Sequence, residues 1–101
     1  MSDRLGQLTH DEFAAHLNEP FQLRSDDATH ELRLVEANAL AAPGAAPTRR
    51  APFSLVFRGP RSVQLAQQIH RLEHPALGVL ELFLVPIAPD ALGPRYEAIF
   101  G

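Results

Sequence analysis

Five histidines give this chain its best candidates for metal chemistry, and the densest group of possible ligands is His70, Glu73 and His74. Two histidines four residues apart can chelate one ion on a helix, but along a strand they stand ~13 Å apart. The flanking residues alternate with period 2 and Pro75 follows directly, which indicates a strand. We therefore expect no metal site: His74 should shape the turn, and His70 should pack beside Leu72.

Catalytic groups of other kinds lack a recognisable arrangement. The chain contains no cysteine, and none of its serines lies in a Gly-x-Ser-x-Gly elbow. Glu73, Glu81 and Glu97 alternate with apolar residues, as solvent-facing strand positions do, while Asp26-Asp27 is typical of a turn. The sequence locates no Ser-His-Asp triad and holds no glycine-rich phosphate loop. We expect a protein that is not an enzyme and needs no cofactor.

Positive charge is concentrated in one segment of an acidic chain. The net charge is −3, yet residues 49–61 contain four arginines and no acid, whereas residues 1–48 contain eight acids and three arginines. Every cation is arginine, whose planar, multiply donating head group suits interfaces. We expect the segment to meet an acidic surface, either a partner's or that of this chain's own N-terminal half. The predicted partner-binding residues are Arg49, Arg50, Arg58 and Arg61.

Nucleic acid is a weaker interpretation of the same segment. Arginine contacts phosphates and aromatic rings stack on bases, and Phe53 and Phe57 lie among the arginines. These rings share a face with Leu55, however, which assigns them to the core, and the chain as a whole is acidic. The charge pattern therefore favours a protein partner.

One short helix must precede the segments that carry these residues. Thr9 stands three residues before Glu12, so the two side chains can each bond the other's amide in a capping box. Phe13 and Leu17 lie four apart and share a face, and the residue before Pro20 avoids the helical region. This pattern predicts a helix over residues 9–18.

After Pro20 the apolar period changes to two, which predicts strands for the rest of the chain. The segment at 79–87 is apolar on both faces and should be central or covered on both sides, with Pro86 marking where pairing stops. Residues 39–51 are rich in alanine and proline and predict a mobile loop. The predicted strands are residues 21–25, 30–37, 52–58, 68–74, 79–87 and 95–100.

Length and composition fit one domain over residues 1–101, since 46% of the residues are hydrophobic and can supply a core. The fold class expected is mainly β: a small antiparallel barrel or sandwich of about six strands, with the short N-terminal helix covering an opening. The first residues contain Asp3 and Arg4 and no apolar run, so we expect a cytoplasmic protein without membrane contact.

Four strings carry a family resemblance: Phe-Ser-Leu-Val-Phe-Arg-Gly-Pro at 53–60, Leu-Glu-His-Pro-Ala-Leu-Gly at 72–78, Phe-Leu-Val-Pro-Ile at 83–87 and Tyr-Glu-Ala-Ile-Phe at 96–100. Together with the N-terminal helix, they resemble a family of short bacterial proteins classed as a domain of unknown function. The resemblance implies no activity, and it implies neighbouring genes for phage-tail-collar-type proteins. The family pattern usually has an aromatic residue where this chain has His70, which suggests a core or interface position.

These observations favour a non-catalytic structural or protein-interaction module and, through the resemblance, an accessory component of a phage-tail-like assembly. It would bind a protein partner or a second copy through the arginines and a free strand edge. The alternative is a small ligand-binding barrel or barrel enzyme with a site around His70, His74 and Tyr96. A deep pocket lined by these three would favour the alternative, and a filled barrel with an exposed edge would favour the module.

Overall fold

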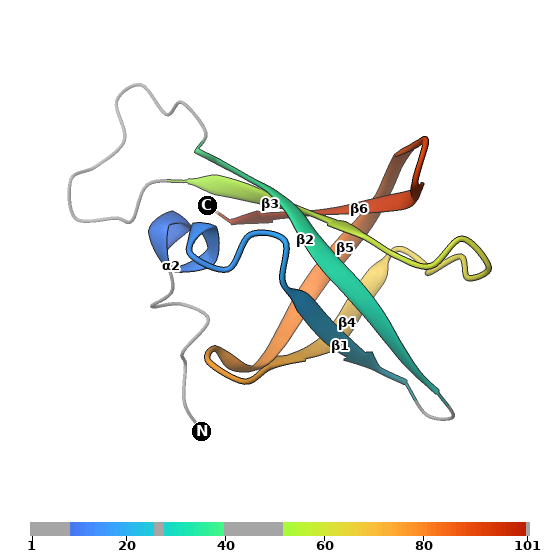
Figure 1. Cartoon of the computed structure of the whole chain (residues 1–101), viewed down its shortest axis with the longest axis horizontal. Helices are drawn as coiled ribbons and strands as arrows, with labels where there is room; N and C mark the ends of the chain where they lie inside the picture. Colours follow the sequence, from blue (N-terminus) through green and yellow to red (C-terminus); the bar gives the residue numbers. More distant parts are fainter. Residues whose placement is uncertain (1–8, 26–27, 40–51, 101) are drawn as a thin grey trace.

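The computed structural model describes residues 9–25, 28–39 and 52–100. The apolar alternation after Pro20 produces strands, and the capping box produces one helix before them (Figure 1). The elements in chain order are α2 (His10–Ala14), β1 (Pro20–Arg24), β2 (Thr29–Ala39), β3 (Phe53–Arg58), β4 (Gln68–His74), β5 (Gly78–Asp90) and β6 (Gly93–Phe100).

The strands form a closed antiparallel barrel in the order β1-β2-β3-β6-β5-β4, in which β4 pairs back onto β1. The predicted fold class is therefore confirmed, and of its two forms the barrel is correct. The expected free strand edge is wrong for these described strands, because each one has a neighbour on both sides. Closure satisfies the ladder hydrogen bonds that an edge would have offered to a partner.

The predicted helix is present but shorter than expected. The capping box is confirmed: the Thr9 amide donates to Glu12 Oε1 at 3.0 Å, and the Glu12 amide donates to Thr9 Oγ1 at 3.4 Å. The helix ends at Ala14, and a turn follows, in which Asn18 has a positive φ of 70°. This turn attaches to β2, because the Asn18 amide donates to the Leu34 carbonyl at 2.7 Å. The tertiary contact ends the helix earlier than the sequence pattern predicts.

Strand β5 changes partners along its length. It pairs with β4 as far as Leu84 and with β6 from Val85 onward, so Pro86 follows the end of one ladder but takes part in the other. Of the two expected arrangements, the central position is correct, since β5 lies between β6 and β4. Coverage of both faces is wrong, because Val79 and Phe83 on the outer face are about half exposed. A barrel has only one interior, and the side chains that alternate outward from β5 face solvent.

Aromatic and leucine side chains fill the barrel interior, and both ends are covered. At one end Phe13 of α2 packs on Phe53 and Phe100, with ring centroids 5.8 and 5.6 Å apart. At the other end, Leu65 from the β3–β4 connection is buried beside Tyr96. Figure 1 shows α2 and the β5–β6 hairpin at opposite ends of the molecule. The predicted loop at 39–51 begins inside β2, which includes Ala39, and its remainder lies outside the described residues.

Candidate functional site

His70 and Tyr96, two members of the alternative ligand site, anchor the β3–β4 connection. The Tyr96 hydroxyl accepts a hydrogen bond from the Leu65 amide at 3.0 Å and lies 3.5 Å from the Val63 carbonyl. His70 Nε2 lies 2.8 Å from the Ala66 carbonyl, to which it donates. Both side chains are buried, so their polar atoms hold this connection over the barrel end.

His74, the third member, has a different role at another turn. Its Nδ1 accepts hydrogen bonds from the amides of Ala76 at 3.0 Å and Leu77 at 3.3 Å, which confirms that His74 shapes this turn. Its Nε2 lies 2.8 Å from Glu19 Oε1. Because Nδ1 accepts from two amides, the ring proton must be on Nε2, which donates to the carboxylate. The three predicted ligand-site residues are therefore bound to two separate segments of backbone.

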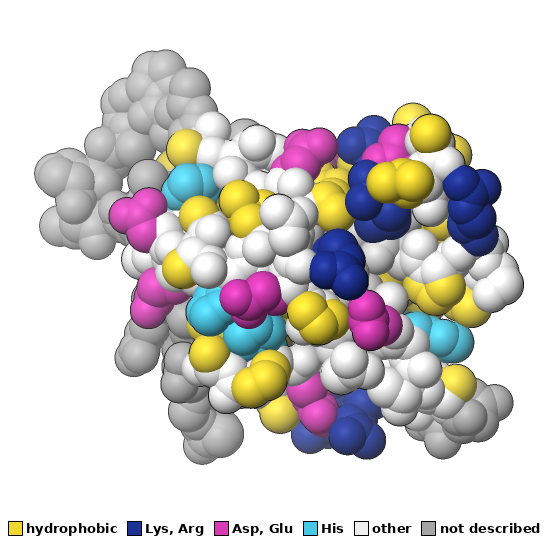
Figure 2. All heavy atoms as spheres, viewed as in Figure 1, with side chains coloured by type: hydrophobic (Ala, Val, Ile, Leu, Met, Phe, Trp, Pro, Cys, Tyr) yellow, Lys and Arg dark blue, Asp and Glu magenta, His cyan; other side chains and the backbone are white. Residues whose placement is uncertain are grey.

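A cluster that the sequence analysis missed is formed by His16, Glu19 and His74. His16 Nδ1 lies 2.8 Å from the same oxygen, Glu19 Oε1, that His74 contacts, and the two imidazole rings are 4.5 Å apart. The hydrogen bonds from His74 and then from His16 lower the pKa of Glu19. Figure 2 shows histidine side chains gathered around an acidic side chain on the face below α2. The only local signal was the i,i+3 spacing of His16 and Glu19.

Metal binding is the first chemistry to test for this cluster, because one ligand atom from each residue lies within 4.8 Å of the others. A neutral imidazole that binds a metal through Nε2 carries its proton on Nδ1. In His74 that proton would point at the amides of Ala76 and Leu77, which already donate to Nδ1. The hydrogen-bond pattern therefore favours a structural cluster that joins the turn after α2 to the end of β4.

Arg58, one of the predicted partner-binding residues, is tied to the β5–β6 turn. Its guanidinium donates from Nε to Asp90 Oδ1 at 3.1 Å and forms an ion pair through Nη2 with Oδ2. Asp90 Oδ1 also accepts from the amides of Leu92 at 2.9 Å and Gly93 at 3.2 Å. The hydrogen bond from Arg58 is the main cause that lowers the pKa of Asp90 to about 2, and the two amide bonds act in the same direction. Asp90 in turn raises the pKa of Arg58. Arg58 thus organises the turn.

The turn packs tightly on the segment that follows β3. The Gly59 amide donates to the Pro94 carbonyl at 3.0 Å. Gly93 has a φ of +145°, and a Cβ there would lie 3.2 Å from the Gly59 carbonyl oxygen, so only glycine fits. Arg61 lies against the same turn, and its Nη2 donates to the Ala91 carbonyl.

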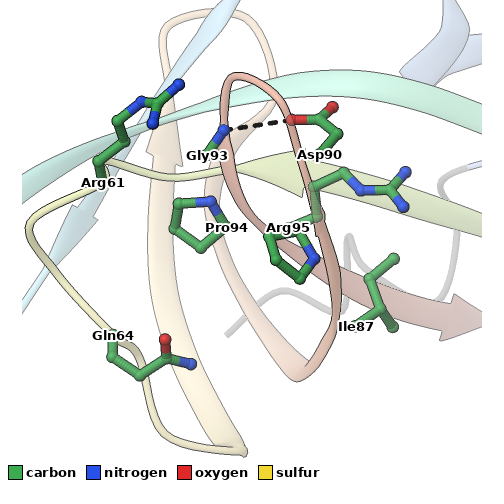
Figure 3. Close-up of a pocket in the computed structure, with 8 residues that line it drawn as sticks. Arg61, Gln64, Ile87, Asp90, Gly93, Pro94 and Arg95 are labelled. Carbon is green, nitrogen blue, oxygen red and sulfur yellow. Dashed lines mark hydrogen bonds between the residues drawn. The ribbon is translucent and has the colours of Figure 1, made fainter.

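A hollow of about 450 Å³ lies beside this turn, and Arg61 and Arg95 both line it. Arg95 donates from Nε to the Ala88 carbonyl at 3.0 Å and reaches Glu36 Oε2 at 3.4 Å. Figure 3 shows Arg61 and Gln64 on one side of the hairpin, with Arg95 on the other. We call this feature the arginine hollow; its lining residues are Arg61, Gln64, Ile87, Pro89, Asp90, Gly93, Pro94 and Arg95.

The charged segment of the sequence accounts for part of this site. Arg58 and Arg61 lie at the turn, and Figure 2 shows basic side chains gathered at the corresponding end of the molecule. Arg95 was missed because it lies in a different part of the chain, beside no other cation. Arg49 and Arg50 lie outside the described residues.

None of the described helices is long and apolar enough to cross a membrane.

Comparison with known proteins identifies the family of this chain. No curated protein and no solved structure gives a significant match. A family model, described as a domain of unknown function (DUF6916), matches residues 8–100 and so includes every element of the barrel. The chain belongs to the DUF6916 family.

Proposed function

We propose that this chain is a non-catalytic protein-interaction module that binds an acidic segment of a partner protein in the arginine hollow. The observation that carries the proposal is that the Arg61 guanidinium has donors left for a ligand. Within the described residues its head group bonds a backbone carbonyl and has no carboxylate partner, although it is exposed beside a hollow. A guanidinium with remaining donors forms strong, often bidentate bonds to carboxylates.

The neighbouring residues support a mixed polar and apolar partner segment. Among the described residues, Glu36 is the only carboxylate that Arg95 contacts, at 3.4 Å, so the Arg95 guanidinium retains donors for a second acceptor. Ile87, Pro89 and Pro94 add apolar surface to the same hollow. Interfaces commonly combine arginine with apolar contacts of this kind. Because Asp90 already neutralises Arg58, we assign Arg58 the role of holding the turn in place.

A protein segment fits better than nucleic acid. Phe53 and Phe57, the rings that could stack on bases, are completely buried in the barrel core, so no aromatic face accompanies the arginines of the hollow. The filled interior also does not favour the ligand-binding alternative, because His70 and Tyr96 use their polar atoms on the backbone. Through the family resemblance, we extend the proposal to an accessory component of a phage-tail-like assembly, in which the barrel would link larger subunits.

The proposal is tested by capturing partners from the native host with the tagged chain. We expect one specific protein to co-purify with the wild type and with Arg71→Glu, and to be lost with Arg61→Glu or Arg95→Gln. Arg71→Glu is the matched control, since Arg71 is an exposed arginine on β4 outside the hollow. Equal loss in all three variants would indicate a nonspecific charge effect, and equal recovery would contradict the assignment of the hollow. Recovery of nucleic acid alone would refute the choice of partner class.

A further inference from the structure

The outer face of β4 and β5 exposes large apolar side chains that the barrel does not need for its own core. Ile69 on β4 is 63% exposed, and Phe83 on β5 is 51% exposed. The register places these two residues directly opposite each other, so their side chains form one apolar pair on the surface.

A charged pair lies next to this apolar pair. Arg71 and Glu81 are opposite each other in the register, on the same outer face and two residues from Ile69 and Phe83. Both are exposed. Within the described residues, no ion pair or side-chain hydrogen bond joins them to each other or to a third residue. Glu73, the next outward residue on β4, differs in this respect, since it holds Arg24 at 2.9 Å. The Arg71 and Glu81 head groups are therefore available to a second molecule.

We propose that a second copy of this chain packs on the β4–β5 face. A two-fold axis that runs along the strands, midway between β4 and β5, places β4 of each copy over β5 of the other. Arg71 then lies over Glu81 of the other copy, and Ile69 lies over Phe83. The complementarity follows from the register. Arg71 is opposite Glu81 within one copy, so an axis that exchanges the two strands brings each charge over the opposite charge of the other copy.

A second copy is favoured over an unrelated protein because it already carries opposite charge and apolar surface in the matching order along the strands. An unrelated partner would have to present the same order by chance. The outer surface of a barrel is convex, which limits the contact to a few rows. We expect a weak dimer that forms as the protein concentration rises. The face shares no residue with the arginine hollow, so the dimer does not depend on the proposed function.

Sedimentation velocity from micromolar to millimolar protein tests the proposal. The wild type should shift from monomer to dimer, and Phe83→Ser should weaken the dimer. Arg71→Glu and Glu81→Arg should each weaken it about tenfold or more, because like charges then meet across the axis. The double variant Arg71→Glu/Glu81→Arg should restore the wild-type behaviour, and Arg61→Glu should have no effect. Circular dichroism of each variant checks that the barrel is intact.

Two results would overturn the proposal. The first is a wild type that remains monomeric at millimolar concentration. If Phe83→Ser then also removed a host protein from capture, the face would bind a different partner, and the proposal of a second copy would be wrong. The second is a dimer that the charge-swapped double variant fails to restore, because this would place the contact elsewhere. The failure of the proposed function would instead appear in the Arg61→Glu capture experiment.

Discussion

Replacement of Tyr96 by phenylalanine removes the hydroxyl that holds the β3–β4 connection. The phenol oxygen accepts from the Leu65 amide at 3.0 Å, and the ring is completely buried. Phenylalanine preserves the packing of the ring but leaves the Leu65 N–H without a partner. A buried donor that loses its acceptor costs ~1–3 kcal/mol. Since Leu65 is 8% exposed and water has little access to its amide, we expect a loss of ~1–2 kcal/mol in the free energy of unfolding.

Urea denaturation of wild type and Tyr96→Phe measures this loss, and an unchanged denaturant dependence would show that the unfolded states are comparable. Amide hydrogen exchange gives the local result: the Leu65 amide should exchange faster in the variant, whereas the Phe57 amide, in the adjacent strand β3, should change only through global stability. Equal stability together with unchanged Leu65 exchange would refute the claim that the hydroxyl secures this end of the barrel.

Three further predictions concern other parts of the chain. Because Arg58 and the turn amides lower the pKa of Asp90 to about 2, its stabilising effect is complete above the ordinary value of 3.8 and disappears as the pH falls toward 2. The difference in unfolding free energy between wild type and Asp90→Asn should therefore shrink over that range, and a constant difference would contradict it. Thr9→Ala should cost ~1 kcal/mol in urea denaturation through the loss of the cap, and unchanged stability would show that the cap contributes nothing. Dialysis against zinc should leave no stoichiometric metal, whereas retained zinc that His74→Ala removes would show that the ring changes its tautomer.

The local elements could be predicted because their signals are local. The capping box of Thr9 and Glu12 requires only four residues, and the alternation of Phe53, Leu55 and Phe57 shows which face of β3 is buried. Barrel closure depends on the pairing of β1 with β4 and of β3 with β6, which lie far apart in the chain. Nothing in one sequence encodes such pairs in a readable pattern, so the barrel and the sandwich both remained open.

The same limit explains why the contacts of the candidate site residues could not be predicted. The sequence does not show that Arg58 is paired, because its partner Asp90 lies far along the chain, at the end of β5, which is two strands from β3 in the barrel order. Arg95 joins the hollow only because the β5–β6 turn packs on Gly59. His74 was correctly linked to its turn, a local feature, whereas its contact with Glu19 is set by the tertiary fold.

NMR of the arginine Nε–Hε groups tests whether the arginine hollow selects acidic protein segments. A hexaglutamate peptide is titrated into the labelled protein, with Arg24 and Arg71 as internal controls outside the hollow. We expect saturable shifts at Arg61 and Arg95 and smaller changes at the controls. Shifts of similar size at all four groups, or none at Arg61, would contradict it.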